Sequence, residues 1–482
     1  MTLKKYLIGL ILFLSLGLTG CVSFGRNPGF KEVSKNVQNR LDVQIEKPSK
    51  KSLEEIKQTI LPLLEEPLTL DRAVKIALVN NQQLQAEFEE LGITKADLLQ
   101  ATLVKNPRFE GFARSSSEGT NTEFSISQDV MDILLMPLKR RVAKAEFEQT
   151  KLWVADAVLS LVAEVKSAFY EAQATEQVRN FQQTVLEASE AAVELADRQV
   201  KAGNIKALDF SNQQAAYEEA QLDFNRSQAA VLAAREPLNR LLSLSGKEAT
   251  NWQIESELPK LPESDPPLEG LEQKALSQRL DLAAVRKQVE VFRRGLLAAR
   301  LGIIREGEVG FNTEKETNGE RVTGPTWSVG VPIFDWQQAS RARTKAQLRQ
   351  SEYAANAFEV QVQSEVREAL NRLAAARFAV ERYQNKIIPV REQIVNLTQQ
   401  QYNFMLMGVY DLLLAKQNEI LAQRDYIEAL KDYWIAWTNL ERATGGKFPE
   451  FKKPAKENSK PVQQSTNEMQ GMQYMHHHGG KS

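Results

Sequence analysis

The sequence predicts a mainly α-helical protein that is built as two tandem repeats, each with a pair of β-strands between its helices. Three observations lead to this prediction. No proline occurs between Pro137 and Pro237, and apolar residues there recur at alternating spacings of three and four, as in a coiled-coil helix. Segments around Phe124 and Trp327 alternate apolar and polar residues instead, which is typical of a strand with one apolar face. The order of helix, strands and long helical hairpin then occurs twice.

Composition excludes several classes of function. The 482 residues carry 61 basic and 62 acidic side chains, a formal net charge of -1, so the chain lacks the overall basicity that phosphate contacts require. The three histidines stand together at 476–478, and the single cysteine is Cys21. The central part of the chain therefore offers no histidine for acid–base work or metal ligation. With no glycine-rich phosphate loop either, the sequence predicts neither an enzyme nor a nucleic-acid partner.

The N-terminus has the features of a secretory signal. Residues 1–20 place two lysines before an apolar run and end with small residues directly before Cys21. This arrangement resembles a bacterial lipobox, which would make Cys21 the lipidated first residue of the mature chain. A buried free cysteine or a short membrane anchor is the alternative. Because Val22 follows where an inner-membrane lipoprotein has aspartate, we expect the outer membrane as destination.

The first half of the chain divides by the period of its apolar residues. An extended, lipidated N-terminal segment is expected over 21–67, with one short helix at 53–64. The first repeat is expected over 68–246, and its elements follow in order: a helix at 70–104, strands at 106–115 and 122–130, a long helix at 138–202 and a return helix at 208–244. At about 1.5 Å per residue the long helix would measure on the order of 100 Å, which no compact domain contains.

The second half repeats this plan after a linker at 247–266. The second repeat is expected over 267–446, with a helix at 267–302, strands at 308–313 and 326–333, a long helix at 339–404 and a return helix at 410–444. Asp209 of the first repeat matches Asp411 of the second. The remaining 447–482 are rich in Lys, Pro, Gln, Asn and Ser and are expected to be disordered.

The strands pose a physical problem. One side of the last strand is expected to carry Trp327, Val329, Val331 and Ile333 and the other Thr326, Ser328 and Gly330, as in a membrane strand with lipid outside and water inside. A sheet of four strands has open edges, and a bilayer does not tolerate unpaired backbone groups. Several chains must therefore close the barrel together. The alternative is a soluble hairpin packed on the helices.

Several segments together resemble the TolC family of outer-membrane efflux and secretion channels. They are residues 68–81, the end of the last strand at 331–335, the turn at 199–203 and the duplicated plan, over about residues 68 to 446. The resemblance implies a homotrimer with a twelve-stranded β-barrel in the outer membrane, four strands from each chain, and a hollow α-helical barrel across the periplasm. It also implies an exit duct that works with an inner-membrane pump and a periplasmic adaptor protein.

The resemblance places a periplasmic constriction at the helix turns. Asp411 takes the place of a constriction aspartate, Tyr402 that of a tyrosine, and Asp209 is the equivalent of Asp411 in the first repeat. Both aspartates could instead serve as helix N-caps, each contributing about 1 kcal/mol, and the two roles are compatible.

The second turn departs from the family pattern. Met405 stands where glycine is common, Met407 where the best-known member has a basic residue, and Leu414 where it has a second acidic one. A gate closed by a network of charges is therefore in doubt. An apolar plug formed by 404–407 is a reasonable substitute.

The tail ends with ligands that suit soft metal ions: Met469, Met472, Met475, His476, His477 and His478. A transient metal contact there would favour metal ions as cargo; an inert tail is the alternative. No cofactor is expected beyond this ion and the covalent lipid at Cys21. A type I secretion or multidrug exit duct, a lipid-anchored periplasmic coiled-coil scaffold, and a metal-sequestering lipoprotein remain as alternative functions.

Overall fold

The computed structural model describes residues 28–46, 53–117, 119–255, 257–265, 269–303 and 306–448. The chain divides into two units, Met1–Lys447 and Phe448–Ser482, and the helices and strands of the described residues all belong to the first. The expected signal sequence, Cys21 and the methionines and histidines of the tail lie outside the described residues.

Two short helices precede the first repeat. α3 (Leu53–Leu64) agrees with the predicted helix at 53–64. α2 (Phe30–Leu41) was not predicted, and the expectation of an extended chain was wrong there. α2 contacts α6, and its apolar residues at spacings of three and four, the signal that was missed, are buried: Phe30, Val33 and Val37.

The single helix predicted over 70–104 is wrong, because the chain forms two helices. α4 (Leu70–Asn80) and α5 (Gln82–Gln100) meet at Asn81, whose backbone is extended and whose side chain caps the first turn of α5. The side-chain amides of Asn80 and Asn81 also donate to carbonyl oxygens at the end of α7, at 2.7 and 2.8 Å. The break thus supplies partners for carbonyls that a helix end leaves unpaired.

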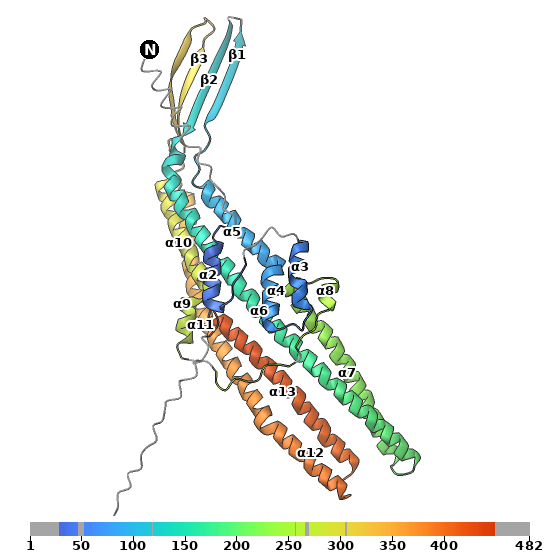
Figure 1. Cartoon of the computed structure of the whole chain (residues 1–482). Helices are drawn as coiled ribbons and strands as arrows, with labels where there is room; N and C mark the ends of the chain where they lie inside the picture. Colours follow the sequence, from blue (N-terminus) through green and yellow to red (C-terminus); the bar gives the residue numbers. More distant parts are fainter. Residues whose placement is uncertain are drawn as a thin grey trace, which may run out of the picture. The chain divides into compact units, whose positions relative to one another are not determined.

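The four strands form one antiparallel sheet in chain order, seen at one end of the ribbon in Figure 1. They are β1 (Arg108–Ser116), β2 (Gly119–Asp129), β3 (Gly307–Lys315) and β4 (Arg321–Val329). The strand predicted over 326–333 is displaced: it begins earlier and ends at Val329. Pro332 has no N–H to donate to a ladder, which explains why pairing stops before it.

The helical hairpin of the first repeat is continuous. α6 (Val130–Lys201) runs for 72 residues and returns as α7 (Ala207–Leu242). It begins eight residues before the predicted start, since the side chain of Asp129 accepts the N–H of Asp132 and caps it there. Pro137 lies in the second turn without ending the helix. The short α8 (Lys247–Thr250) follows in the linker.

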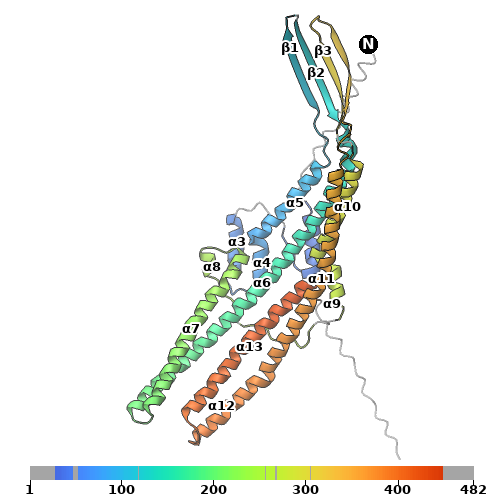
Figure 2. The same ribbon diagram turned by 180° about the vertical axis from the view of Figure 1, so that it is seen from behind.

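The second repeat has the same order with more interruptions (Figure 2). The helix predicted at 267–302 is divided at Arg279 into α9 (Leu271–Gln278) and α10 (Leu280–Leu301). The long helix predicted at 339–404 is α11 (Gln338–Arg382), a π-helical turn η1 (Tyr383–Ile387) and α12 (Ile388–Asn403). The return helix is α13 (Val409–Ala443).

α6 is the central element of the packing, because helices from both repeats contact it: α2, α4, α5, α7, α10 and α13. Of the coiled-coil positions that the sequence predicts, Val158, Leu161, Val165 and Ala172 are buried, and Ala168 is half-buried. No helix in the described part of the chain is both long enough and apolar enough to cross a membrane.

Candidate functional site

The tips of the two helical hairpins have the same backbone conformation. At the first tip the N–H groups of Gly203 and Asn204 donate to carbonyl oxygens of the last turn of α6, at 3.0 and 2.9 Å. At the second tip Met405 and Leu406 make the equivalent bonds to α12, both at 2.9 Å. This pattern is a Schellman motif, which requires a left-handed residue just past the helix end.

The two tips differ in the residue that adopts the left-handed conformation. Gly203 does so at φ 74° without steric cost, whereas Met405 adopts φ 58°. A side chain in this region costs about 1 kcal/mol or more. Met405 is 94% exposed, so packing within its own chain does not compensate for that strain. Its neighbours Phe404 and Leu406 are each 75% exposed, and Met407 is 41% exposed.

The two aspartates occupy the third position of their helices and are not N-caps, which corrects that part of the prediction. The carboxylate of Asp209 accepts the backbone N–H of Lys206 at 3.3 Å, and that of Asp411 accepts the N–H of Gly408 at 3.0 Å. Each reaches back to the N-cap residue, which is one half of a capping box. Both also place negative charge in the first turn, where the helix dipole favours it.

Tyr410 is a tip residue that sequence reasoning missed. Its hydroxyl oxygen is buried and has no hydrogen-bond partner among the described residues. Burial, with a smaller contribution from the negative charge of Asp209, raises the pKa of Tyr410. Tyr402, the predicted constriction tyrosine, is 39% exposed.

The strand register confirms the predicted alternation of the sheet. Trp327 is opposite Val309 and Phe109 is opposite Ile126, so one face, the apolar sheet face, gathers large apolar side chains. Its members are Phe109, Phe124, Ile126, Val309, Phe311, Pro325, Trp327 and Val329. Trp327 is 80% exposed.

The opposite face, the polar sheet face, is rich in carboxylates. It carries Arg108, Glu110, Asn121, Glu123, Ser127, Glu308, Asn312 and Glu314, together with the apolar Phe112 and Val322. Glu308 pairs with Arg108 at 2.9 Å, Glu123 accepts from Asn312 at 2.7 Å, and Glu314 accepts from Asn121 at 2.6 Å. A single sheet with one apolar and one hydrogen-bonded polar face suits a boundary between lipid and water.

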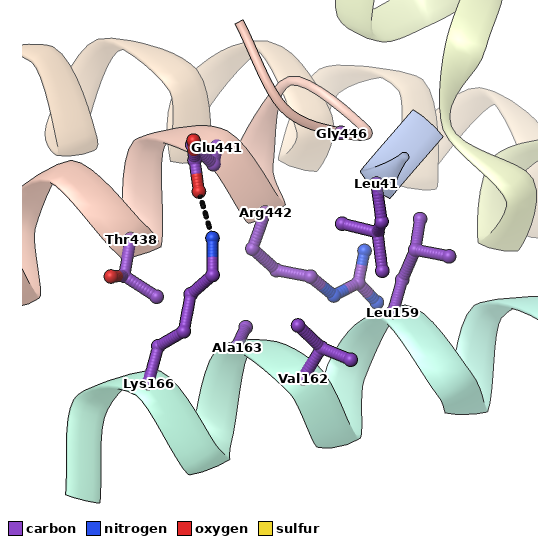
Figure 3. A pocket seen from close by; sticks show the side chains of 9 residues that line it. All are labelled: Leu41, Leu159, Val162, Ala163, Lys166, Thr438, Glu441, Arg442 and Gly446. Atoms are coloured by element: carbon purple, nitrogen blue, oxygen red, sulfur yellow. Dashed lines mark hydrogen bonds and ion pairs between the residues drawn. The ribbon is translucent and has the colours of Figure 1, made fainter. Parts of the chain in front are cut away.

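A buried group of charged residues, which sequence reasoning also missed, joins the two repeats where the hairpins begin. Arg442 of α13 donates to Asp156 of α6 at 2.8 Å and to Ser160 at 2.9 Å. Lys166 of α6 pairs with Glu441 at 2.6 Å, an interaction drawn in Figure 3 beside the apolar side chains of the same small cavity.

We call this group, together with Arg279, Asp281 and Glu365, the ionic junction. Its second half lies at the start of α10. Arg279 pairs with Asp281 at 2.6 Å and with Glu365 of α11. Burial alone would raise the pKa of Asp281, but the paired Arg279 outweighs it and holds that pKa below its ordinary value. Asp156 behaves differently: burial raises its pKa to about 6 although Arg442 favours its charged form. Oδ1 of Asp156 and Nη1 of Arg442 have no hydrogen-bond partner in the described residues.

Comparisons with known proteins agree with this geometry. The chain is 24% identical to the cobalt-zinc-cadmium resistance protein CzcC of Cupriavidus metallidurans over 79% of its length and 90% of CzcC. Its fold matches the Campylobacter jejuni CmeC outer membrane channel with a TM-score of 0.69, at 17% identity, over 86% of this chain and 93% of that one. The outer membrane protein VceC of Vibrio cholerae matches with a TM-score of 0.64, at 15% identity, over 79% and 97%.

The signature of the family described as outer membrane efflux protein matches residues 74–244. The chain is similar to TolC-like outer-membrane efflux proteins in sequence and in fold. This family consists of outer-membrane channel proteins and not of enzymes. The chain has the predicted fold class, mainly helical with a small four-stranded sheet.

No group of three or more His, Cys, Asp or Glu residues in the described ranges of the chain is arranged to hold a metal ion. The residues that the prediction missed left weak signals in the sequence. Tyr410 stands directly before Asp411, and Arg442 occupies the place that Arg240 has in the first repeat. Only the packing distinguishes them, since Arg240 is exposed and Arg442 is half-buried in the junction.

Proposed function

We propose that this protein is the exit duct of a tripartite efflux system, which passes substrate from an inner-membrane pump and a periplasmic adaptor to the exterior. The observation that supports this function best is the sheet. It has one exposed apolar face and one polar face, and neither of its outer strands, β1 and β4, has a second neighbouring strand in the described part of the chain.

The open edges require several chains, and we propose a homotrimer. Unpaired backbone groups in a bilayer cost several kcal/mol each, so β1 of one chain must pair with β4 of the next. Closed membrane barrels have about eight strands or more, and three chains with four strands each give twelve. The polar sheet face then lines the lumen, and the apolar sheet face contacts lipid. A periplasmic scaffold would have no use for such a face.

We place the periplasmic gate at the hairpin tips. In a trimer three copies of each tip approach the threefold axis, which brings together Asp209, Asp411, Tyr402, Met405 and Met407. The exposed apolar side chains of the second tip would form the plug, while the carboxylates form an acidic ring whose field attracts cations. The strained conformation of Met405 supports this placement, because a strained and exposed side chain gains its contacts only from another chain.

Metal ions are the proposed cargo. The similarity to a cobalt-zinc-cadmium resistance protein favours them over multidrug or type I secretion cargo. Residues outside the described ranges extend the proposal: a lipid on Cys21 would anchor the chain, and the tail would contact the ion transiently through Met469, Met472, Met475, His476, His477 and His478. Deletion of the gene should lower resistance to metal ions, and a chain truncated after Gly446 should restore it. Restoration that requires the tail would favour a metal-sequestering lipoprotein instead.

Two neighbouring substitutions in β4 test the duct itself. Val329→Asp puts a charge on the lipid face, at a cost of a few kcal/mol per chain, and should prevent formation of heat-modifiable trimers in the outer membrane. Ser328→Asp puts the same charge on the lumen face and should be tolerated. Equal tolerance of both substitutions would contradict the membrane barrel. Incorporation of labelled palmitate into the wild type but not into Cys21→Ser would establish the anchor.

A further inference from the structure

The apolar sheet face is too short to cover the hydrocarbon core alone. On β4 it extends from Pro325 to Val329, roughly 15 Å along the strand, which a 45° tilt reduces to about 10 Å. Membrane barrels carry an apolar band about 25 Å tall. Toward the strand tips the same face carries the small or charged side chains Ser115, Thr120, Lys315, Arg321 and Thr323. The missing apolar surface must come largely from elsewhere.

Exposed apolar side chains continue directly from β4 toward the helices. Val331 is 71% exposed, Ile333 66%, Phe334 91% and Trp336 54%. On the neighbouring start of α6, Ile133 and Leu134 are 40% and 67% exposed. We call Val331, Ile333, Phe334 and Trp336 together with Ile133 and Leu134 the apolar collar; Asp335, which lies among them in the sequence, is an exposed carboxylate. A contiguous exposed apolar surface of this kind marks an interaction site.

The two parts of the collar lie at the same level of the molecule. Leu135 of α6, Gly302 at the end of α10 and Gln337 before α11 line one common hollow. Gly307 of β3 also approaches Met131 of α6 closely. The collar is thus continuous with the apolar sheet face, which the proposed barrel already places in lipid.

The backbone of the collar is suited to an apolar surrounding. Pro332 has no N–H, the N–H of Gly330 donates to Glu306 at 3.0 Å, and that of Ile333 donates to Val331 at 2.9 Å. The side chain of Asp335 accepts the N–H of Gln337 at 2.7 Å. These bonds satisfy backbone groups that would otherwise be costly to place near hydrocarbon.

Basic residues follow the collar on both helices. On α6 they are Lys139, Arg140, Arg141 and Lys144, and on α11 they are Arg341, Arg343 and Lys345. At about 1.5 Å per residue, Arg141 lies roughly 10 Å along the helix from Leu134. This separation is comparable to the head-group layer, which is about 5–8 Å thick on each side of a bilayer. Basic side chains at that depth meet the phosphates of the lipid head groups.

We infer that the apolar collar enters the periplasmic leaflet of the outer membrane and completes the hydrophobic band of the barrel. The partner of this surface is phospholipid: acyl chains against the collar and phosphate groups against the basic residues that follow. The inference rests on the proposed membrane barrel. It adds that the membrane boundary lies on the helix starts and not at the ends of the strands.

Three exposed phenylalanines allow a matched test. In a Cys21→Ser background, Phe334→Cys, Phe124→Cys and Phe378→Cys each receive a nitroxide label; Phe378 is 60% exposed and lies on α11, away from the collar and the tips. The trimers are reconstituted into vesicles of phosphatidylethanolamine and phosphatidylglycerol. Collisions of the label with oxygen report lipid, and collisions with a water-soluble nickel chelate report water. We expect labels at 334 and 124 to favour oxygen by at least threefold relative to the label at 378.

The outcomes separate the inference from the proposed function. A label at 334 that favours the nickel chelate, as at 378, while 124 favours oxygen, would overturn the collar and leave the barrel intact. Protection of 334 from both reagents would mean that a second copy covers the collar, and would also overturn the inference. A label at 124 that lies in water would contradict the membrane barrel itself.

Discussion

The two helical hairpins share one plan but differ at three levels. In the first, α6 runs unbroken for 72 residues to a tip at Gly203. In the second, the outgoing helix is interrupted by the π-helical turn η1, and the tip is at Met405. Near the base of the hairpins, Arg240 of the first is exposed while its repeat partner Arg442 is bound in the ionic junction. The outgoing helix of the first hairpin is thus continuous, and that of the second is interrupted.

The interruption has an identifiable cause in the sequence. Pro389 is the second residue after η1, and a proline ring within a helix removes one hydrogen bond and clashes with the carbonyl of the preceding turn. Widening the turn to π geometry relieves that clash. Aligning the tips at Gly203 and Met405 places Glu187 opposite Pro389, and Glu187 lies in the uninterrupted part of α6. Duplication therefore supplied the plan, and single residues made the two halves mechanically different.

The largest expected effect comes from the ionic junction. Arg442→Met removes the partner of Asp156 and leaves a buried carboxylate unpaired, at a cost of about 3–5 kcal/mol. The midpoint temperature for dissociation of the trimer in detergent should fall markedly. Arg240→Met makes the same change at the exposed repeat position and should alter stability by less than about 0.5 kcal/mol. Equal effects would mean that the junction does not distinguish the hairpins.

Placing a proline in the first hairpin and removing the one in the second should change stability almost as much as Arg442→Met does. Glu187→Pro introduces a proline into the interior of α6 and should destabilise the first hairpin by about 3 kcal/mol. Pro389→Ala should instead allow a regular helix, so amide hydrogen exchange over 383–388 should slow. Exchange that is unchanged in Pro389→Ala would show that another residue causes the π turn.

The pH dependence of the junction is the next effect in size. Because burial raises the pKa of Asp156 to about 6, the folded protein binds this proton more tightly than the unfolded chain does. Stability from this group is therefore greatest below the ordinary carboxyl pKa and decreases as the pH rises through 6, by on the order of 2 kcal/mol. Melting curves of Asp156→Asn between pH 4 and 7 should lack this decrease. A parallel decrease in the variant would assign it to another group.

These contrasts show how far sequence reasoning reached. Periodicity predicted the long helices, the strand faces and the repeat, because apolar spacing is fixed by burial on one side. It failed at Asn81 and Arg279, where side chains bond to the distant backbone of Leu241 or to the distant carboxylate of Glu365, and end a helix whose apolar pattern continues. It missed the ionic junction for the same reason. The partners Asp156 and Arg442 are far apart in sequence, and only the packing of α6 on α13 brings them together.

Exchanging glycine and methionine at the left-handed position of each tip should change stability by about 1 kcal/mol, in opposite directions at the two tips. Met405→Gly relieves the left-handed strain and should raise the stability of the second hairpin by up to about 1 kcal/mol, while it removes part of the proposed plug. Gly203→Met should lower stability by a similar amount at the first tip. In planar bilayers Met405→Gly should raise the resting conductance, and adding Met407→Gly should raise it further. Greater stability without a change in conductance would remove Met405 from the gate and leave only the strain.

The smallest effect on stability, and the most specific one on transport, concerns the two aspartates. Asp411→Asn keeps an oxygen that can accept the N–H of Gly408 but removes the charge, so it should cost only a few tenths of a kcal/mol through the helix dipole. Asp209→Asn should behave alike at the first tip.

If three copies of each carboxylate form an acidic ring, the double variant should lose cation selectivity in planar-bilayer recordings, most clearly at low salt, where screening is weakest. Asp411→Ser and Asp209→Ser, which also remove the charge, should give the same loss. Selectivity that persists in both double variants would leave the aspartates with their capping role alone, and the field of the lumen would then have to come from the carboxylates of the polar sheet face.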